Sequence, residues 1–155
     1  DQYGNVNVSK FGDRNDGAGG FINIAEGAKK VIFSGTLTSS GLKTTINDGR
    51  LKILNEGKNK KFIKKVKQIT YSSKLGTKRG QTIIFNTDRG VFKFIKNKIT
   101  LIEIAQGVRL KEDILNQINF PIKISNKLKR ISKSLYLDKK FDLKKHFKKK
   151  YYGSK

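Results

Sequence analysis

Between residues 30 and 105 the sequence is a series of short β-branched and aromatic segments separated by Gly, Asn and Asp, and this pattern limits the fold more than any other feature. The strongest local signal is "LKTTINDGRLKIL", where two β-prone segments flank Asn47, Asp48 and Gly49, a turn sequence that β-hairpins prefer. Four further strands are predicted in "VKQITY", "GQTIIFNT", "GVFKFI" and "KITLIEIA". Because the breaks between them are short, these strands are expected to form a meander.

Two segments before the hairpin also have strand character. In "YGNVNVS", Val6 and Val8 alternate with asparagines, which is the period of a half-buried strand. The apolar run in "KKVIFSGT" lacks this alternation and predicts a buried central strand.

Helical spacing appears late, in "VRLKEDILNQI", where it is set by Leu110, Ile114, Leu115 and Ile118. The spacing predicts a helix over 110–118. It should end near Asn119, because proline follows two residues later and cannot continue a helix. One helical turn is also expected in "SSKLGTKRG", although its glycines weaken it.

The net charge of +23 raises the question of a nucleic-acid partner. The positive charge comes from 29 lysines and only 6 arginines. Arginine is the preferred side chain for phosphate and base recognition, whereas lysine supplies mainly point charge. The composition therefore does not favour a nucleic-acid partner. A basic nucleic-acid-binding module and a structural or assembly module stay open as alternative functions.

Residues that the sequence lacks exclude several kinds of site. Without cysteine there is no disulfide, thiolate metal site or cysteine nucleophile. The single histidine, His146, lies in "KKHFKKK", where a solvated side chain is expected rather than a ligand or a base. The longest apolar runs are too short for a membrane-spanning helix. We expect no metal site, no membrane partner and a cytoplasmic location, and the start at Asp1 leads us to expect a piece of a longer protein.

The stretch "NDGAGGFINI" places Gly17, Gly19 and Gly20 within four positions. Ordering glycine costs backbone entropy, so such a cluster indicates a special requirement on the backbone. The requirement could be a tight turn between strands, or a loop whose backbone N–H groups approach a polar or charged group. The glycines alone do not decide between these interpretations.

Several motifs occur in the order seen in one enzyme family. They are "GNVNVSKFG", "GAGGFINI", "KKVIFSGTLT", "RGQTIIFNTDRGVFKF" and "LIEIAQGVRLKEDILNQINFPIKIS". With them, residues 1–125 resemble the family I coenzyme A transferases, and more narrowly the fused-chain acyl-CoA:acetate/3-ketoacid members. The resemblance implies the C-terminal part of an α/β, mixed-sheet CoA-transferase-like fold, a β-rich meander with few helices. Residues 126–155 are left as a Lys-rich tail that could be helical.

For the parent enzyme, the resemblance implies transfer of CoA from an acyl-CoA to acetate or a 3-ketoacid. In such ping-pong reactions a glutamate carboxylate attacks the thioester, and CoA is then held as a glutamyl-CoA thioester. The resemblance assigns Gly17, Gly19 and Gly20 to a loop whose backbone N–H groups face the thioester carbonyl. It implies no permanently bound cofactor, because the CoA thioester is a substrate. The expected partners are the acyl-CoA and carboxylate substrates, the rest of the parent chain and further copies in a homo-oligomer.

The family's nucleophilic glutamate lies before the segment where this chain begins, so no catalytic residue is assigned here. Among the four glutamates, Glu56 lies in an exposed-looking turn, and Glu26 follows the glycine loop where the family motif has no nucleophile. Glu103, in a predicted strand, and Glu112, in the predicted helix, are expected to be structural. The isolated chain is therefore expected to be inactive.

Three further polar residues are candidates for the site or for the structure around it. Asn5 and Asn7 could shape a substrate pocket through their amides, or could serve as turn and edge-strand residues. Arg89, in "NTDRGVF", stands where the family has a similar arginine. We expect Arg89 to form a structural ion pair rather than to bind substrate.

Overall fold

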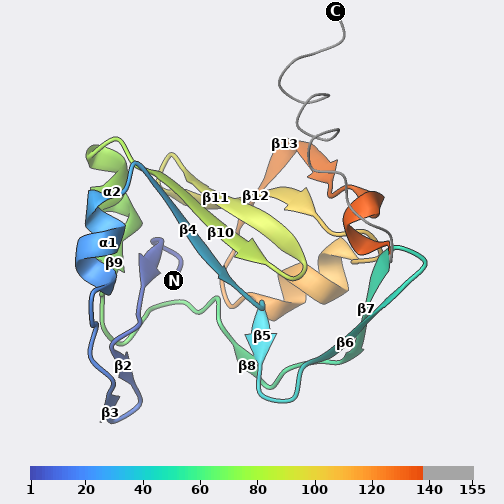
Figure 1. The fold of residues 1–155 in the computed structure, drawn as a ribbon, viewed down its shortest axis with the longest axis horizontal. Helices are drawn as coiled ribbons and strands as arrows, with labels where there is room; N and C mark the ends of the chain where they lie inside the picture. Colours follow the sequence, from blue (N-terminus) through green and yellow to red (C-terminus); the bar gives the residue numbers. More distant parts are fainter. Residues whose placement is uncertain (138–155) are drawn as a thin grey trace, which may run out of the picture.

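The computed structural model describes residues 1–137, and its largest element is a five-stranded mixed sheet (Figure 1). Its strands are β4 (Lys30–Gly35), β10 (Thr82–Thr87), β11 (Gly90–Ile95), β12 (Lys98–Ile104) and β13 (Lys123–Arg130). Their order is β13-β12-β11-β10-β4. The central strand β11 is antiparallel to both β10 and β12, whereas β4 and β13 run parallel to their neighbours. The predicted mixed sheet and the meander at its centre are confirmed.

One face of this sheet carries the core. The register places Phe85 of β10 between Phe33 of β4 and Phe92 of β11, so three aromatic rings line that face. Phe62 covers them, with its ring centroid 4.9 Å from that of Phe92. Phe120 belongs to the same core and stacks on Phe62, with ring centroids 6.5 Å apart. Phe92, which is fully buried, therefore lies at the centre of the core.

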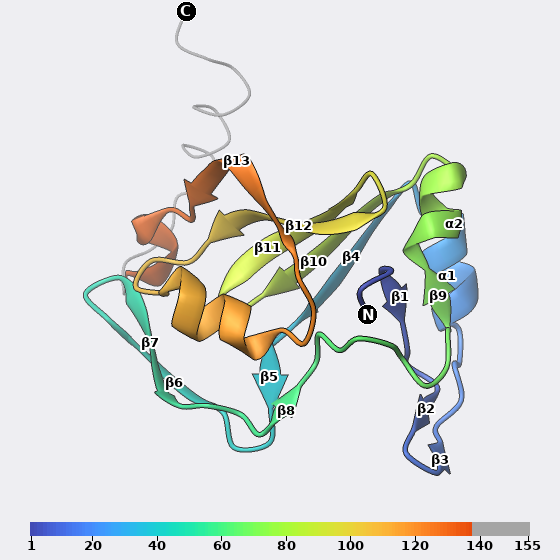
Figure 2. The same ribbon diagram turned by 180° about the vertical axis from the view of Figure 1, so that it is seen from behind.

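Four two-stranded sheets surround the main sheet (Figure 2). The hairpin β2–β3 lies at the same end of the molecule as the helices α1 and α2, and the hairpin β6–β7 lies at the opposite end. The pairs are β1 (Asn5–Val6) with β9 (Tyr71–Ser72), β2 (Lys10–Phe11) with β3 (Arg14–Asn15), β5 (Thr38–Ser39) with β8 (Asn59–Lys60), and β6 (Lys43–Asn47) with β7 (Arg50–Asn55).

The β6–β7 hairpin confirms the strongest local prediction. Asn47 pairs with Arg50, so the turn consists of Asp48 and Gly49 alone. Both turn residues have positive φ, 46° and 67°. A two-residue turn of this hand matches the twist of the flanking strands and favours Asp-Gly.

The helices are short: α1 (Phe21–Gly27), α2 (Ser73–Lys78), η1 (Leu110–Ile114), η2 (Leu115–Gln117) and η3 (Lys133–Tyr136). The predicted helical turn in 72–80 is α2, and the predicted helix over 110–118 is helical but not a regular α-helix. It begins with a π-helical turn and ends with a 3₁₀ turn, because the N–H of Leu115 bonds to the carbonyl of Leu110 and that of Ile118 to the carbonyl of Leu115. Helix α1 was not predicted, and no side chain caps its first turn, which begins after Gly20.

The prediction of a buried central strand in "KKVIFSGT" is wrong for the part of the chain that the structure describes. Strand β4 is at the edge of the sheet and pairs only with β10 among residues 1–137. Val31 is buried, whereas Ile32 is 54% exposed. An uninterrupted apolar run indicates burial on two faces, but these residues cover only one face of β4.

Two boundaries also differ from the sequence-based expectations. The predicted strand in "VKQITY" contains only the first residue of β9, because residues 61–70 carry four lysines and run over the surface. Strand β13 reaches Arg130, so Lys129 and Arg130, in the first part of the expected Lys-rich tail, pair with β12. The rest of the expected tail beyond residue 137, including His146, lies outside the described residues.

Candidate functional site

The glycine loop, residues 17–20, connects the β2–β3 hairpin to α1. Gly17 and Gly19 have φ values of +75° and +52°, in the left-handed region that glycine adopts without strain. A Cβ at either position would meet no heavy atom within 4 Å. Backbone conformation, rather than crowding, is therefore the structural reason for glycine at these two positions.

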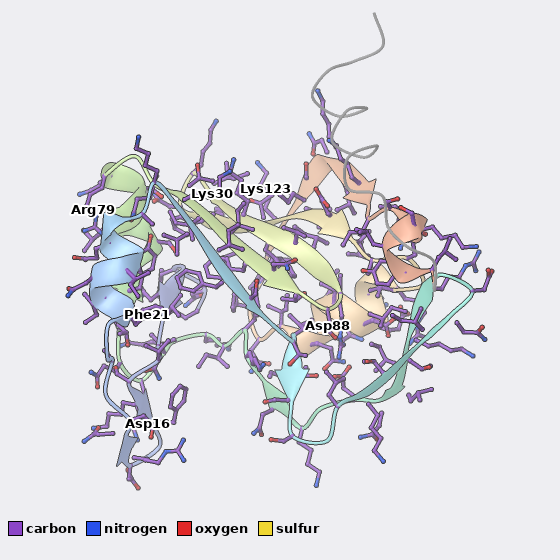
Figure 3. The ribbon with its side chains drawn as sticks, viewed as in Figure 1. Asp16, Phe21, Lys30, Arg79, Asp88 and Lys123 are labelled. Atoms are coloured by element: carbon purple, nitrogen blue, oxygen red, sulfur yellow. The ribbon has the colours of Figure 1, made fainter. Side chains whose placement is uncertain are left out.

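The loop is exposed, and its ends are fixed by backbone hydrogen bonds. The N–H of Asp16 donates to the carbonyl of Ser9 at 2.9 Å, and that of Phe21 donates to the carbonyl of Ala18 at 3.1 Å. In Figure 3, Asp16 and Phe21 mark the two sides of the loop. Within residues 1–137 no backbone carbonyl accepts a hydrogen bond from the N–H of Gly17, Gly19 or Gly20. These three amides are available to a polar group from outside the described chain.

The two asparagines make local hydrogen bonds. The Asn7 side-chain oxygen accepts from the N–H groups of Ser9 and Lys10 at 3.1 Å, and its amide donates to the carbonyl of Lys10. The Asn5 amide donates to the Asp1 carboxylate at 3.2 Å. Asn7 thus forms the turn that leads to Ser9, whose carbonyl holds the beginning of the glycine loop. A direct role of Asn5 or Asn7 in a substrate pocket stays a prediction.

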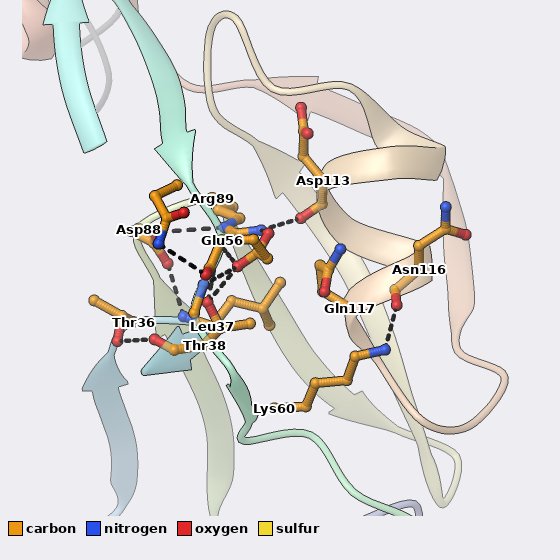
Figure 4. A network of polar contacts seen from close by, with 12 residues as sticks. Thr36, Leu37, Thr38, Glu56, Lys60, Asp88, Arg89, Asp113, Asn116 and Gln117 are labelled. Carbon is orange, nitrogen blue, oxygen red and sulfur yellow. Dashed lines mark hydrogen bonds and ion pairs between the residues drawn. The ribbon is translucent and has the colours of Figure 1, made fainter. Parts of the chain in front are cut away.

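A buried ion-pair network lies at the carboxyl ends of β4 and β10 (Figure 4). The Arg89 side chain has no exposed surface and donates to both carboxylate oxygens of Glu56, at 2.6 and 2.7 Å. It also donates to the Thr38 hydroxyl at 3.1 Å, to the Asp113 carbonyl at 2.8 Å and to the Asp88 carboxylate at 3.3 Å. The expected structural ion pair of Arg89 is confirmed, and every N–H of its guanidinium fork points at protein atoms.

The expectation that Glu56 is exposed is wrong. Its side chain is one-third exposed, and one of its oxygens also accepts from the Thr38 hydroxyl and the N–H of Gly57. Hydrogen bonds from Arg89 hold the pKa of this carboxyl below its ordinary value, against the opposing effect of burial. A carboxylate so fully engaged is a poor nucleophile, so Glu56 has a structural role.

The remaining glutamates are also accounted for by the structure. Glu26 lies in α1 and forms an exposed ion pair with Arg79 at 3.3 Å. Glu103 lies in β12 and Glu112 in η1, as expected from the sequence. In Figure 3, Asp88, which precedes Arg89, lies well apart from Asp16 and Phe21. The structure therefore brings Asn7 to the glycine loop but places the Arg89 network elsewhere.

The described residues contain neither a candidate metal site nor a candidate membrane-spanning helix. Among residues 1–137 no group of three or more histidine, aspartate or glutamate side chains is arranged to hold a metal ion. In the same residues no helix has the length and apolar character needed to cross a membrane.

Known proteins provide the context for this geometry. No protein-family model matches the chain. Acetate CoA-transferase YdiF of Escherichia coli (strain K12) is 46% identical to it over 138 residues, which are 89% of this chain and 26% of that protein. The chain is homologous to CoA-transferases. Caffeate CoA-transferase of Acetobacterium woodii is 45% identical over 144 residues, or 90% of this chain and 27% of that protein. The chain thus spans about a quarter of the length of these curated relatives.

Solved CoA-transferase structures share the fold. The acyl-CoA transferase YdiF of E. coli O157:H7, in a thioester complex with CoA, superposes with a TM-score of 0.86 over 89% of this chain and 27% of that one. The apoenzyme of the same protein gives a TM-score of 0.88 over 90% of this chain. Both are 46% identical to this chain. The mixed sheet with few helices is therefore the fold of the corresponding part of a CoA-transferase.

Proposed function

We propose that the parent protein transfers CoA between an acyl-CoA and a short-chain carboxylic acid, and that this chain forms one part of its acyl-CoA site. The observation that carries the proposal is the 46% identity to YdiF over 138 residues, which are 89% of this chain. The name of that relative supports acetate as an acid substrate. The name of the Acetobacterium relative shows that the acyl group differs among these homologues, so a 3-ketoacid is one candidate among several.

The proposed reaction has two half-reactions that share one covalent intermediate. A glutamate carboxylate attacks the thioester carbonyl and expels the CoA thiolate, which leaves a mixed anhydride of the glutamate and the acyl group. The thiolate then attacks the glutamyl carbonyl, so that the acid product leaves and a glutamyl-CoA thioester remains. A second carboxylate reverses these steps and departs as the new acyl-CoA. Each attack on a carbonyl places negative charge on its oxygen.

In this proposal the glycine loop stabilises that oxygen. Backbone N–H groups aimed at a developing oxyanion are a strong source of catalysis, and losing one such donor costs about 10²- to 10³-fold in rate. The exposed amides of Gly17, Gly19 and Gly20 could approach a thioester closely, because no Cβ stands in front of them.

The nucleophilic glutamate belongs to the part of the parent that precedes residue 1. Residues 1–125 belong to the CoA-transferase domain, and the parent is a cytoplasmic homo-oligomer.

The test is a CoA-exchange assay on the parent protein and on the 155-residue chain. With acetyl-CoA and propionate as substrates, the parent should produce propionyl-CoA and acetate, and the isolated chain should produce none above background. A parent that binds CoA but exchanges no acyl group would overturn the proposed reaction. Exchange by the isolated chain would overturn the proposed location of the nucleophile.

A further inference from the structure

Gln81 makes a set of buried contacts with the carboxyl end of α1. Its side-chain amide lies 2.8 Å from the carbonyl oxygen of Ala25, 3.2 Å from that of Glu26 and 2.5 Å from that of Ala28. The residue is only 8% exposed. The last carbonyls of a helix have no partner within the helix, so this amide supplies the cap that α1 lacks.

Gln81 is itself held in place from the other side. Its side-chain oxygen accepts a hydrogen bond from the Tyr71 hydroxyl at 2.9 Å. Burial raises the pKa of the Tyr71 phenol, so the hydroxyl keeps its proton and remains a donor. A Cβ at Gly76 would lie 2.2 Å from this hydroxyl and 2.7 Å from the Gln81 oxygen, so the pair needs glycine there. The orientation of the Gln81 amide is thus fixed by its neighbours.

Helix α1 has few other attachments in the described chain. It has seven residues and no side-chain cap at its beginning, and a helix this short is unstable without tertiary contacts. Ala25 is its one buried residue, whereas Ile24 is 76% exposed. Phe21, which directly follows Gly20, packs on Phe33 with ring centroids 6.0 Å apart. The ring of Phe33 in turn packs on Tyr71 at 5.4 Å.

These contacts join the two ends of α1 into one unit. Gln81 holds the carboxyl end, and Tyr71 supports both Gln81 and, through Phe33, the residue that follows the glycine loop. A two-turn helix moves as a rigid rod about 10 Å long, so a shift at its carboxyl end is passed to the loop at its beginning. We propose that Gln81 is a positioning residue that sets the orientation of the glycine-loop amides through α1. This inference rests on the proposed oxyanion role of that loop.

The test uses the parent protein with Gln81→Glu, which keeps the volume but replaces the donor with a charge facing three carbonyls. Gln106→Glu is the matched control, because the Gln106 amide donates to a single carbonyl, that of Ile131, on the side of the sheet away from β4. Two quantities are measured. The first is the rate constant for formation of a covalent enzyme–CoA adduct after mixing with acetyl-CoA, by rapid quench and mass spectrometry. The second is hydrogen exchange of peptides covering residues 17–28.

The positioning role predicts that Gln81→Glu slows adduct formation about 10- to 100-fold, since a displacement of about 1 Å costs roughly that much. KM for acetyl-CoA should change less than about threefold, because the loop acts on the transition state and not on CoA binding. Exchange over residues 17–28 should accelerate, while Gln106→Glu should change neither quantity. If Gln81→Glu does not fold, Tyr71→Phe replaces it, with a smaller effect in the same direction.

The outcomes separate the two proposals. If the wild-type parent forms no enzyme–CoA adduct, the proposed function fails, and the exchange measurement still decides whether Gln81 orders the loop. If the adduct forms and Gln81→Glu matches wild type in rate or in exchange, the positioning role is overturned. An equal loss of rate in Gln106→Glu would also overturn it, because the effect would then be general destabilisation.

Discussion

Replacing Glu56 with Gln tests whether the Arg89 network holds together the loops at the carboxyl ends of β4 and β10. Glu56→Gln keeps the shape of the side chain but removes its charge, and turns one of its two acceptors into a donor that faces the guanidinium of Arg89. Arg89 is fully buried, so it cannot turn to water for compensation. Breaking a buried ion pair by removing one partner costs about 3–5 kcal/mol.

The lower end of this range applies here. Glu56 is one-third exposed, and the Asp88 carboxylate stays 3.3 Å from Arg89. We therefore expect a loss of about 3 kcal/mol in the free energy of unfolding, a large part of the 5–15 kcal/mol typical of a domain. In a chain of this size the melting temperature should fall by about 6 to 12 °C.

The assay is urea unfolding of the chain, followed by far-UV circular dichroism. Glu56→Gln should lower the midpoint with little change in slope. The matched control is Glu26→Gln, because Glu26 forms the exposed ion pair with Arg79 and should change stability by less than about 0.5 kcal/mol. A Glu56→Gln variant as stable as Glu26→Gln would refute the reasoning that the buried pair stabilises the fold.

Three further predictions concern stability. Hydrogen bonds from Arg89 keep the pKa of Glu56 below its ordinary value of 4.5. The ionised Glu56 therefore stabilises the fold fully above pH 4.5, and this stabilisation is lost as the pH falls through the lowered pKa. Urea midpoints measured from about pH 7 to 3 should fall less in Glu56→Gln than in wild type. Gly19→Ala places a Cβ at φ +52° and should cost about 1 kcal/mol, whereas Gly20→Ala, at φ −79°, should be close to neutral in the same urea assay. Phe92→Ala empties the centre of the core and should cost about 3–5 kcal/mol by the urea midpoint, and a loss below 1 kcal/mol would contradict the packing described.

The parts of the fold that could be predicted from the sequence are those fixed by neighbouring residues. "GVFKFI" is rich in β-branched and aromatic residues and forms β11 with the predicted bounds. The Asp48-Gly49 turn is likewise a local property, because both residues tolerate positive φ and the flanking segments pair directly. The glycine cluster was also evident in the local sequence, although the role proposed for it came from the family resemblance.

The parts that could not be predicted depend on residues far apart in the chain. Helix α1 has no capping residue of its own, and its cap comes from Gln81, more than 50 residues later. Glu56 lies in a segment of lysines and asparagines that reads as exposed, and only the folded chain brings it to Arg89, 33 residues away. The edge position of β4 could not be recognised because its apolar run does not alternate. Gln81 directly precedes the predicted strand in "GQTIIFNT", but polar residues are common at that position, so the sequence did not indicate its capping role.

The most direct test of the central claim is to find where CoA becomes attached. The parent is incubated with acetyl-CoA, trapped at low pH and digested, and the peptide that carries the CoA adduct is identified by mass spectrometry. We predict one adduct, as a thioester on a glutamate that lies outside residues 1–155. An adduct on Glu26, Glu56, Glu103 or Glu112, or no adduct in a parent that exchanges CoA, would contradict the claim.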